Sequence, residues 1–326
     1  MKLKLMSKLT AMIVLLGCAV MANAQTATDA VDALKDGVAK SKAKDYLGAI
    51  VSYKKCIEIY DEIEDPDNDN AVTAATQIPN MQYKYSIGLY KQKKYDESIA
   101  AFQKLSEYSK TYNDAKNGKK AKSIIPKLYY AKGANLLKIK DYAGAITALD
   151  KSIEMNPKYP MAYVRKAQVY KEQKDEVNFK TSIDQAITTS VAKKDVKTEG
   201  TAKKMASTYY FNAGAIAVKS EKYADAEKNF NTLMEYQTVN SDVYYQLAVI
   251  YNKQSKWDAG IEAANKAIEL FKEEDTTKDA KIYYELGNSY IGKGDNAAAC
   301  DAFSKANKGD YAETATYQMK QVLKCQ

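Results

Sequence analysis

The sequence predicts an all-α protein, a solenoid built from about seven stacked helical hairpins. Two observations carry this prediction. First, one pattern recurs: two aromatic or apolar residues, two further residues, a small residue, an apolar residue three positions on, and, as a rule, Tyr or Trp nine positions after the small one. Second, the pattern reappears at a shift of 34 residues, from Gly133 to Ala167 and from Gly214 to Ala248. A fixed period of this length is typical of repeat architectures.

Each recurrence of the pattern has helical spacing. Tyr244, Ala248 and Tyr251 stand at i, i+4 and i+7, which places them on one stripe of a helix. A second stripe begins at Trp257, after a short polar turn. The small residue allows the two helices to approach closely, and each hairpin buries its remaining apolar surface against its neighbours. We therefore expect the stripe tyrosines, such as Tyr244 and Tyr283, to be buried.

The hairpins follow one another along the chain, each centred on a small residue of its first helix. These residues are Gly37, Ser86, Gly133, Ala167, Gly214, Ala248 and Gly287. Extra polar stretches separate several hairpins, and we expect some of them to extend the second helix by a turn or two before a loop. They cover residues 60–77, 107–123, 188–204 and 272–279. The solenoid is predicted over 25–306 and a C-terminal capping helix over 307–326, because a terminal unit must cover the apolar end of the stack.

The residues at the fixed positions of this pattern carry a resemblance to a known family. In the segment 283–306 they are Leu286, Gly287, Tyr290, Ala299, Phe303 and Ala306, and Pro157 closes an earlier hairpin. The pattern resembles the tetratricopeptide repeat (TPR) family, over roughly residues 29–306. The resemblance implies a right-handed superhelical solenoid that is not an enzyme and that binds a peptide or protein partner as an interaction module or assembly scaffold.

Residues 1–24 are predicted to be a secretory signal peptide. A positively charged start precedes the apolar run Leu9–Met21, which ends in a small-residue cleavage site at Ala24. Export would place the mature protein in the cell envelope, in the periplasm of a Gram-negative bacterium. The alternative is a lipid anchor on Cys18, because residues 15–18 resemble a lipoprotein box. The run is short for a membrane span, and the sequence has no second apolar segment, so no transmembrane segment is expected.

Composition argues against several classes of function. Three lysines of the signal peptide contribute to the formal charge of +8, which leaves +5 for the mature chain. No basic cluster coincides with a nucleic-acid motif, so nucleic acid is not an expected partner. The chain has no histidine, the commonest general base and metal ligand, and no phosphate loop, dinucleotide fingerprint or nucleophile elbow. We predict no catalytic residue, no cofactor and no metal.

One acidic segment could be mistaken for a metal site. Carboxylates alternate from Asp65 to Asp69, as in the first half of a calcium loop. An EF-hand also needs Gly at its sixth position and Glu at its twelfth, where this chain has Asn70 and Thr76. The segment is therefore predicted to be a solvated turn between two helices.

The cysteines predict one disulfide. Cys18 would leave with the signal peptide, and Cys56, Cys300 and Cys325 would remain in an exported protein, where disulfides persist. Cys56 takes the place of a small buried residue and is predicted to lie in the core. A bond between Cys300 and Cys325 would clamp the capping helix onto the last hairpin.

A predicted peptide-binding groove follows from the helical phase, because one face of every first helix lines the concave side of such a stack. Its residues are Tyr83, Tyr90, Tyr130, Lys138, Phe211, Lys219, Tyr245, Asn252, Lys253, Tyr284 and Asn288. Aromatic rings with lysines at the helix ends suit an extended peptide with acidic groups. The lysines could instead only face the carbonyl ends of the helices, where cations are favourable. Two alternatives stay open: a periplasmic carbohydrate or cell-wall glycan as ligand, and self-association through the solenoid ends.

Overall fold

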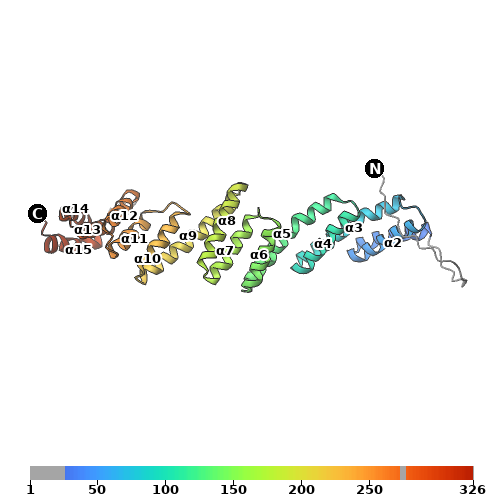
Figure 1. Cartoon of the computed structure of the whole chain (residues 1–326), viewed down its shortest axis with the longest axis horizontal. Coiled ribbons are helices and arrows are strands. Elements are labelled where there is room, and N and C mark those ends of the chain that lie inside the picture. The colour runs from blue at the N-terminus through green and yellow to red at the C-terminus, as the bar shows by residue number, and fades with distance from the viewer. Residues whose placement is uncertain (1–25, 272–276, 326) are drawn as a thin grey trace. The chain divides into compact units, whose positions relative to one another are not determined.

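The computed structural model describes residues 26–271 and 277–325, and over these residues the chain is all-α, as predicted (Figure 1). The predicted signal peptide and the candidate anchor Cys18 lie outside the described residues. The chain divides into two compact units, an N-terminal unit that ends at Leu128 and a C-terminal unit that begins at Tyr129. Each unit is a set of antiparallel helical hairpins.

The N-terminal unit holds the first two hairpins and the beginning of a third. Its helices are α1 (Ala27–Lys42), α2 (Tyr46–Glu62), α3 (Asp69–Lys91), α4 (Tyr95–Thr111) and most of α5 (Ala115–Lys138), whose last residues belong to the C-terminal unit. The core around the rings of Tyr53 and Tyr60 is formed by side chains of α1, α2 and α3. Cys56 is fully buried in it and carries a free thiol, which confirms the predicted core position.

The C-terminal unit continues the hairpins and ends in a short helical segment. Its helices are α6 (Tyr142–Met155), α7 (Pro160–Gln173), α8 (Glu176–Lys193), α9 (Val196–Lys219), α10 (Tyr223–Met234), α11 (Ser241–Lys253), α12 (Trp257–Leu270), α13 (Ala280–Lys293) and α14 (Asn296–Ala306). After them come the 3-10 turn η1 (Gly309–Tyr311), α15 (Ala312–Tyr317) and the π-helical turn η2 (Gln318–Leu323). Residues 309–323 pack against Phe303 of α14 through Ala315, Met319 and Leu323.

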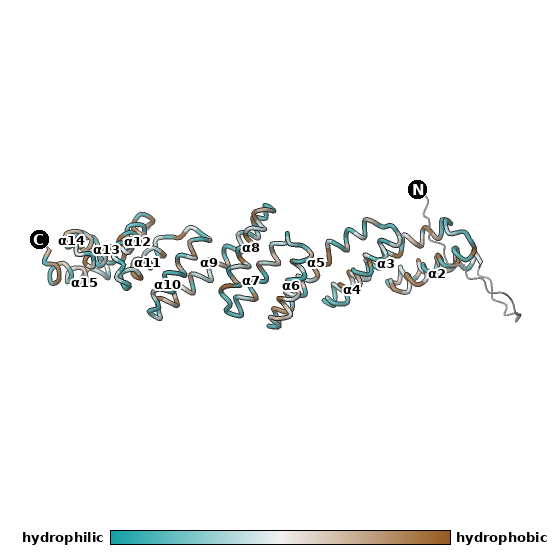
Figure 2. Tube along the Cα trace, in the orientation of Figure 1, coloured by the Kyte–Doolittle hydropathy of each residue, from teal (hydrophilic) through white to brown (hydrophobic). Residues whose placement is uncertain are grey.

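Seven hairpins form in the described chain, and all seven predicted small residues are buried on first helices. At the four glycines among them, a large side chain of the second helix occupies the space that a Cβ would take. A Cβ on Gly287 would lie 2.7 Å from the Phe303 ring, and one on Gly133 would lie 2.7 Å from Leu149. The close approach of the two helices therefore depends on the absence of a side chain at these positions. Hydrophobic and hydrophilic residues alternate along the helices (Figure 2), because an amphipathic helix buries one face and exposes the other to solvent.

The extra stretches between hairpins differ from the expectation in one respect. The second helices α2, α4 and α8 are somewhat longer than α6, as expected, but for the first three stretches the larger part of the insertion extends the first helix of the next hairpin. Thus α3, α5 and α9 have 23, 24 and 24 residues, against 14 in α7. The physical reason is visible in α3, where Ala71, Ala74 and Ile78 are buried against α2. These small apolar residues have helical spacing within segments that are polar on average.

The turn inside a hairpin has a recurring form. In each of the seven described hairpins a residue with left-handed backbone follows the first helix, and in four of them the next residue is an aspartate that caps the second helix. In the other three the next residue is a lysine, whose side chain makes no capping hydrogen bond. Lys140 has φ 62°, and the Asp141 carboxylate accepts a hydrogen bond from the Gly144 N–H at 2.9 Å. The last hairpin uses Gly294 with φ 84° in the same place, followed by Asp295. Capping by Asp satisfies an amide that has no partner inside the helix.

Trp257, the single tryptophan of the chain, opens α12. Its indole ring lies directly against Gly292 of α13, where no other side chain could be accommodated without movement. The ring therefore sits at the contact between the sixth and seventh hairpins.

Candidate peptide-binding groove

A cavity of about 560 Å³ in the C-terminal unit contains two of the predicted groove residues, Phe211 and Lys219. Its lining comes from α9, with one residue each from α10 and α11: Phe211, Asn212, Ala215, Ile216, Val218, Lys219, Phe230 and Gln246. Ala215 and Val218 lie on the same face of α9 as Phe211, because they follow it by four and seven residues. The first-helix face thus forms a real depression beside α9.

The shape of this groove follows from the packing of α9 on α10. Gly214 lies on the buried side of α9, and a Cβ there would be 3.0 Å from the Phe230 ring. The ring can therefore come close to α9, where its edge meets Phe211 at a centroid distance of 6.1 Å. Phe211 remains 45% exposed and Ile216 66% exposed. Apolar side chains left open in a depression favour a binding site.

The chemistry of the groove is apolar with one cationic end. Lys219 is the charged member of the described lining and lies in the last turn of α9. The amides of Asn212 and Gln246 can donate to and accept from a peptide backbone. This arrangement suits a segment with an apolar side chain and a nearby carboxylate.

Tyr245 and Tyr284, also predicted to line the groove, are covered by the chain itself. The Tyr311 ring of η1 lies 5.2 Å from the Tyr284 ring, and Tyr284 also packs on Phe303 at 5.3 Å. Burial, together with a hydrogen bond shared with Tyr311, raises the pKa of Tyr245. Tyr311 was expected only as part of the capping helix, so this contact was missed.

Of the two predicted amides, Asn252 bonds to the neighbouring hairpin and Asn288 bonds within its own helix. The Asn252 side chain on α11 donates to the backbone carbonyl and to the carboxylate of Glu285 on α13, both at 2.9 Å. Ser289 donates to the Asn252 carbonyl oxygen at 2.6 Å, and Asn288 donates to the Glu285 carboxylate at 3.3 Å. The side-chain amides of Asn252 and Asn288 are therefore bonded within the protein, which gives both residues a structural role.

The remaining predicted residues do not join the cavity beside α9. Tyr83 and Tyr90 lie on α3 in the N-terminal unit, and the Tyr83 ring meets the edge of Phe102 at 6.0 Å. Lys138 and Lys253 are exposed in the last turns of α5 and α11. That position agrees with both interpretations of the lysines, as ligands for acidic groups and as favourable charges at helix ends.

Arg165, the single arginine in the sequence, is a residue that the sequence analysis missed. Its guanidinium donates to the Tyr130 hydroxyl at 3.3 Å, and the Tyr159 ring lies 5.2 Å from the Tyr130 ring. Tyr130 is thus held within an aromatic and cationic cluster. The signal that could have found Arg165 is its rarity, one arginine among 49 basic residues.

A second cavity of about 570 Å³ lies among α10, α11 and α12. Its lining residues are Asn231, Met234, Tyr244, Leu247, Tyr251, Ala259, Glu262, Ala263, Asn265, Lys266 and Glu269. Tyr244 was predicted to be buried, but it is only half-buried because one side of its ring faces this cavity. Tyr283 is likewise half-buried, with the Lys308 ammonium 5.7 Å from its ring centre.

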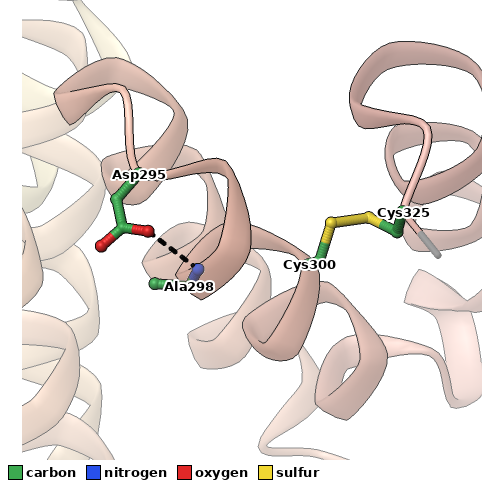
Figure 3. The surroundings of a disulfide bond; sticks show 4 residues. All are labelled: Asp295, Ala298, Cys300 and Cys325. Carbon is green, nitrogen blue, oxygen red and sulfur yellow. Dashed lines mark hydrogen bonds between the residues drawn. A yellow bond between two sulfur atoms is a disulfide. The ribbon is translucent and has the colours of Figure 1, made fainter.

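Cys300 on α14 and Cys325 after η2 are joined in the structure, with their Cα atoms 5.8 Å apart (Figure 3). Asp295, shown in the same view, caps α14 by accepting a hydrogen bond from the Ala298 N–H at 3.0 Å. The bond attaches the end of the C-terminal segment to the last hairpin.

The free cysteine, Cys56, lies in the core of the N-terminal unit. Burial raises the pKa of its thiol, which lowers its reactivity.

The predicted turn between α2 and α3 forms over residues 63–68 and is mostly exposed, whereas Asp69 is the first residue of α3. Asn68 donates to Asp65 at 2.9 Å and accepts from the Asn70 N–H at 3.0 Å, so it caps α3. Within residues 26–271 and 277–325, no three His, Cys, Asp or Glu side chains are grouped so that they could hold a metal ion. In the same residues no helix is long and apolar enough to cross a membrane.

Two family models, both described as tetratricopeptide repeat, match the chain. One matches residues 211–275, and the other matches residues 126–159 and 280–311. These matches fall on the third, fifth, sixth and seventh hairpins. No curated protein matches the chain.

Several solved structures are similar. A tetratricopeptide repeat protein from Parabacteroides merdae is 14% identical, with 92% of this chain and 100% of that chain covered and a TM-score of 0.31. Yeast Sti1, described as a complex of its TPR2AB domain with pHSP90, is 16% identical, with 92% and 98% covered and a TM-score of 0.31. YrrB, described as a TPR protein with an unusual peptide-binding site, is 17% identical, with 68% and 98% covered and the same TM-score.

Proposed function

Because the chain is a tetratricopeptide repeat protein, we propose that it is a non-catalytic interaction module that binds a segment of a partner protein beside α9. The observation that carries the proposal is the cavity in which Phe211 and Ile216 are exposed next to Lys219. An apolar depression with a single cation at one end selects an apolar side chain followed by a carboxylate. Binding would act by holding two proteins together, as an assembly scaffold does.

A selection from a random peptide library on the purified full chain tests this proposal. We expect the bound peptides to be enriched in an apolar residue next to Asp or Glu. Ile216→Asp places a carboxylate in the apolar lining and should lower the affinity of the selected peptides by about a hundredfold. Lys219→Gln should lower it by about tenfold. The matched control is Val177→Asp, at a residue on α8 that is 76% exposed and lies outside the cavity.

Three outcomes would contradict the proposal: no enrichment, equal binding to the wild-type protein and Ile216→Asp, or an equal loss in Val177→Asp. Circular dichroism of each variant checks that the helices persist. Loss of helix in Ile216→Asp would move the test to Ile216→Ser, which adds no charge and should still weaken binding.

We further propose that the protein works in the cell envelope, exported to the periplasm of a Gram-negative bacterium. The support is the charged start, the apolar run and the small-residue site at Ala24. Mass spectrometry of the mature protein distinguishes the two forms of export. A chain that begins at Gln25 supports cleavage, whereas a lipid-modified Cys18 supports the anchored form. A chain that retains Met1 and remains in the cytoplasmic fraction contradicts both.

The alternative ligand, a carbohydrate or cell-wall glycan, finds support in the second cavity. There the Tyr244 and Tyr251 rings lie near the amides of Asn231 and Asn265. Rings that face sugars and amides that bind hydroxyl groups could both serve a glycan. Titration with soluble cell-wall fragments, followed by tyrosine difference spectra, tests this alternative. Tyr251→Ala should abolish the spectral change. If the wild-type protein showed no spectral change, glycan binding in this cavity would be eliminated.

A further inference from the structure

Helix α5, most of which belongs to the N-terminal unit, carries a large excess of positive charge. Its residues 115–138 contain seven lysines and no carboxylate, and so have a net charge of +7. This exceeds the +5 of residues 25–326 together. The first part of this helix, residues 115–123, comes from the polar stretch 107–123. Nothing in the peptide groove beside α9 uses this charge.

Four of these lysines, Lys116, Lys119, Lys122 and Lys127, form what we call the basic face. All four are exposed. They lie away from the stripe by which α5 packs in the N-terminal unit, which consists of the buried residues Asn117, Ala121, Ile125 and Leu128. No carboxylate in the described chain forms an ion pair with any of the four. Helix lysines elsewhere have such partners, for example Lys104 with Glu107 at 2.6 Å and Lys151 with Glu154 at 2.7 Å.

The positions of these lysines oppose the stability of the helix. Lys116 and Lys119 lie near the N-terminus of α5, where the helix dipole is positive and cations are unfavourable. Lys116 and Lys119 are three residues apart, as are Lys119 and Lys122, and like charges at this spacing repel. Asp114 does not neutralise them, because it caps the helix and accepts from the Asn117 side chain as well. A charge pattern that destabilises the fold requires another explanation.

We propose that the basic face is a second interaction surface, which binds an Asp- and Glu-rich segment of a partner protein. The four ammonium groups extend over about 16 Å of helix, which matches about five residues of extended chain. Carboxylates need only charge and hydrogen-bond donors, which lysines supply. The face has no aromatic ring on which a base could stack. It also has no exposed aromatic or large aliphatic side chain that could enter a bilayer. An acidic protein segment therefore fits it best.

The test uses the full chain and a fluorescent oligoglutamate peptide of about ten residues, with anisotropy measured at about 50 mM salt. The basic-face variant replaces Lys116, Lys119, Lys122 and Lys127 with Gln. The matched control replaces four paired lysines, Lys35, Lys104, Lys151 and Lys266, with Gln. The basic-face variant should bind at least about tenfold more weakly than wild type and melt at the same or a higher temperature. The control should bind nearly as wild type does.

Retained binding in the basic-face variant, or an equal loss in the control, would overturn the proposal. So would a lower melting temperature in the basic-face variant, because the lysines would then be stabilising. Phosphatidylcholine vesicles with a minority of phosphatidylserine, and a single-stranded oligonucleotide, serve as competing probes, and tighter binding to either would assign a different partner. Ile216→Asp should leave oligoglutamate binding unchanged, so that failure of this proposal and failure of the groove proposal are distinguished.

Discussion

At Gly287 the separation of the two helices in the last hairpin depends on a missing methyl group. Gly287→Ala would place a Cβ 2.7 Å from the buried Phe303 ring, and we expect it to destabilise the protein by about 1–3 kcal/mol. Gly200→Ala, on α9 with no atom within 4 Å, should instead stabilise it by up to about 1 kcal/mol through helix propensity. Urea denaturation measures both. Equal effects would show that the hairpins tolerate a wider separation.

Tyr236 is expected to make stability fall at alkaline pH. Burial, followed by a hydrogen bond to Asp184 at 2.8 Å, raises its pKa to about 12, whereas an unfolded tyrosine ionises near pH 10. The unfolded state therefore loses its proton first, so this contribution is fully present below about pH 10 and is lost as pH rises to about 12. In Tyr236→Phe the denaturation midpoint should fall less steeply with pH between those two values than in the wild-type protein. Tyr317→Phe, at an exposed tyrosine, should leave the pH dependence unchanged. If the stability of Tyr236→Phe fell as steeply as that of the wild-type protein, another group would be responsible for the alkaline loss.

At the scale of single helices, the turns inside the hairpins carry a cost that the sequence analysis did not anticipate. Left-handed backbone favours glycine, yet most of these turns place lysine there, including Lys44, Lys140 and Lys174. We expect Lys140→Gly to stabilise the protein by about 0.5–1 kcal/mol. Gly294→Ala at the equivalent turn should destabilise it by a similar amount. Thermal denaturation of both variants checks the prediction, and the same sign in both would contradict it.

The C-terminal segment provides a second prediction at this scale. A bond between Cys300 and Cys325 closes 25 residues, for which loop entropy suggests a stabilisation of about 3 kcal/mol. Protein purified without reductant and alkylated before digestion should yield these two cysteines as one linked peptide, with Cys56 modified only after denaturation. Fully alkylated Cys325, or a link from Cys300 to Cys56, would disprove the pairing.

The period of the pattern predicted the helices well and the contacts between distant segments poorly. Small residues such as Ser86 and Ala248 were recognised because a close helix contact imposes a local spacing that repeats. Tyr311 over Tyr284, and Arg165 beside Tyr130, depend on segments that meet only in the folded chain. Helical phase could place Phe211 and Lys219 on one face of α9. It could not show that a cavity forms there, since that depends on how closely Phe230 approaches.

At the scale of the whole molecule, hairpins that contact mainly their neighbours should distribute stability along the chain. Deleting residues 280–326 removes α13, α14 and the C-terminal segment and exposes the side of α12 that packs on α13. The remaining chain should stay helical, melt at a lower temperature and aggregate more readily. Circular dichroism and light scattering measure these effects. Complete loss of helix would show that the hairpins fold only as one cooperative body.

Trp257 makes the C-terminal unit optically distinct from the N-terminal unit. Since the chain has one tryptophan, and its indole lies against Gly292, its emission responds to separation of the sixth and seventh hairpins. Far-ultraviolet dichroism responds to helix in both units. Unfolding followed by the two signals in the wild-type protein will therefore give either one midpoint or two. The difference between the midpoints measures how independently the two units unfold, without any added label.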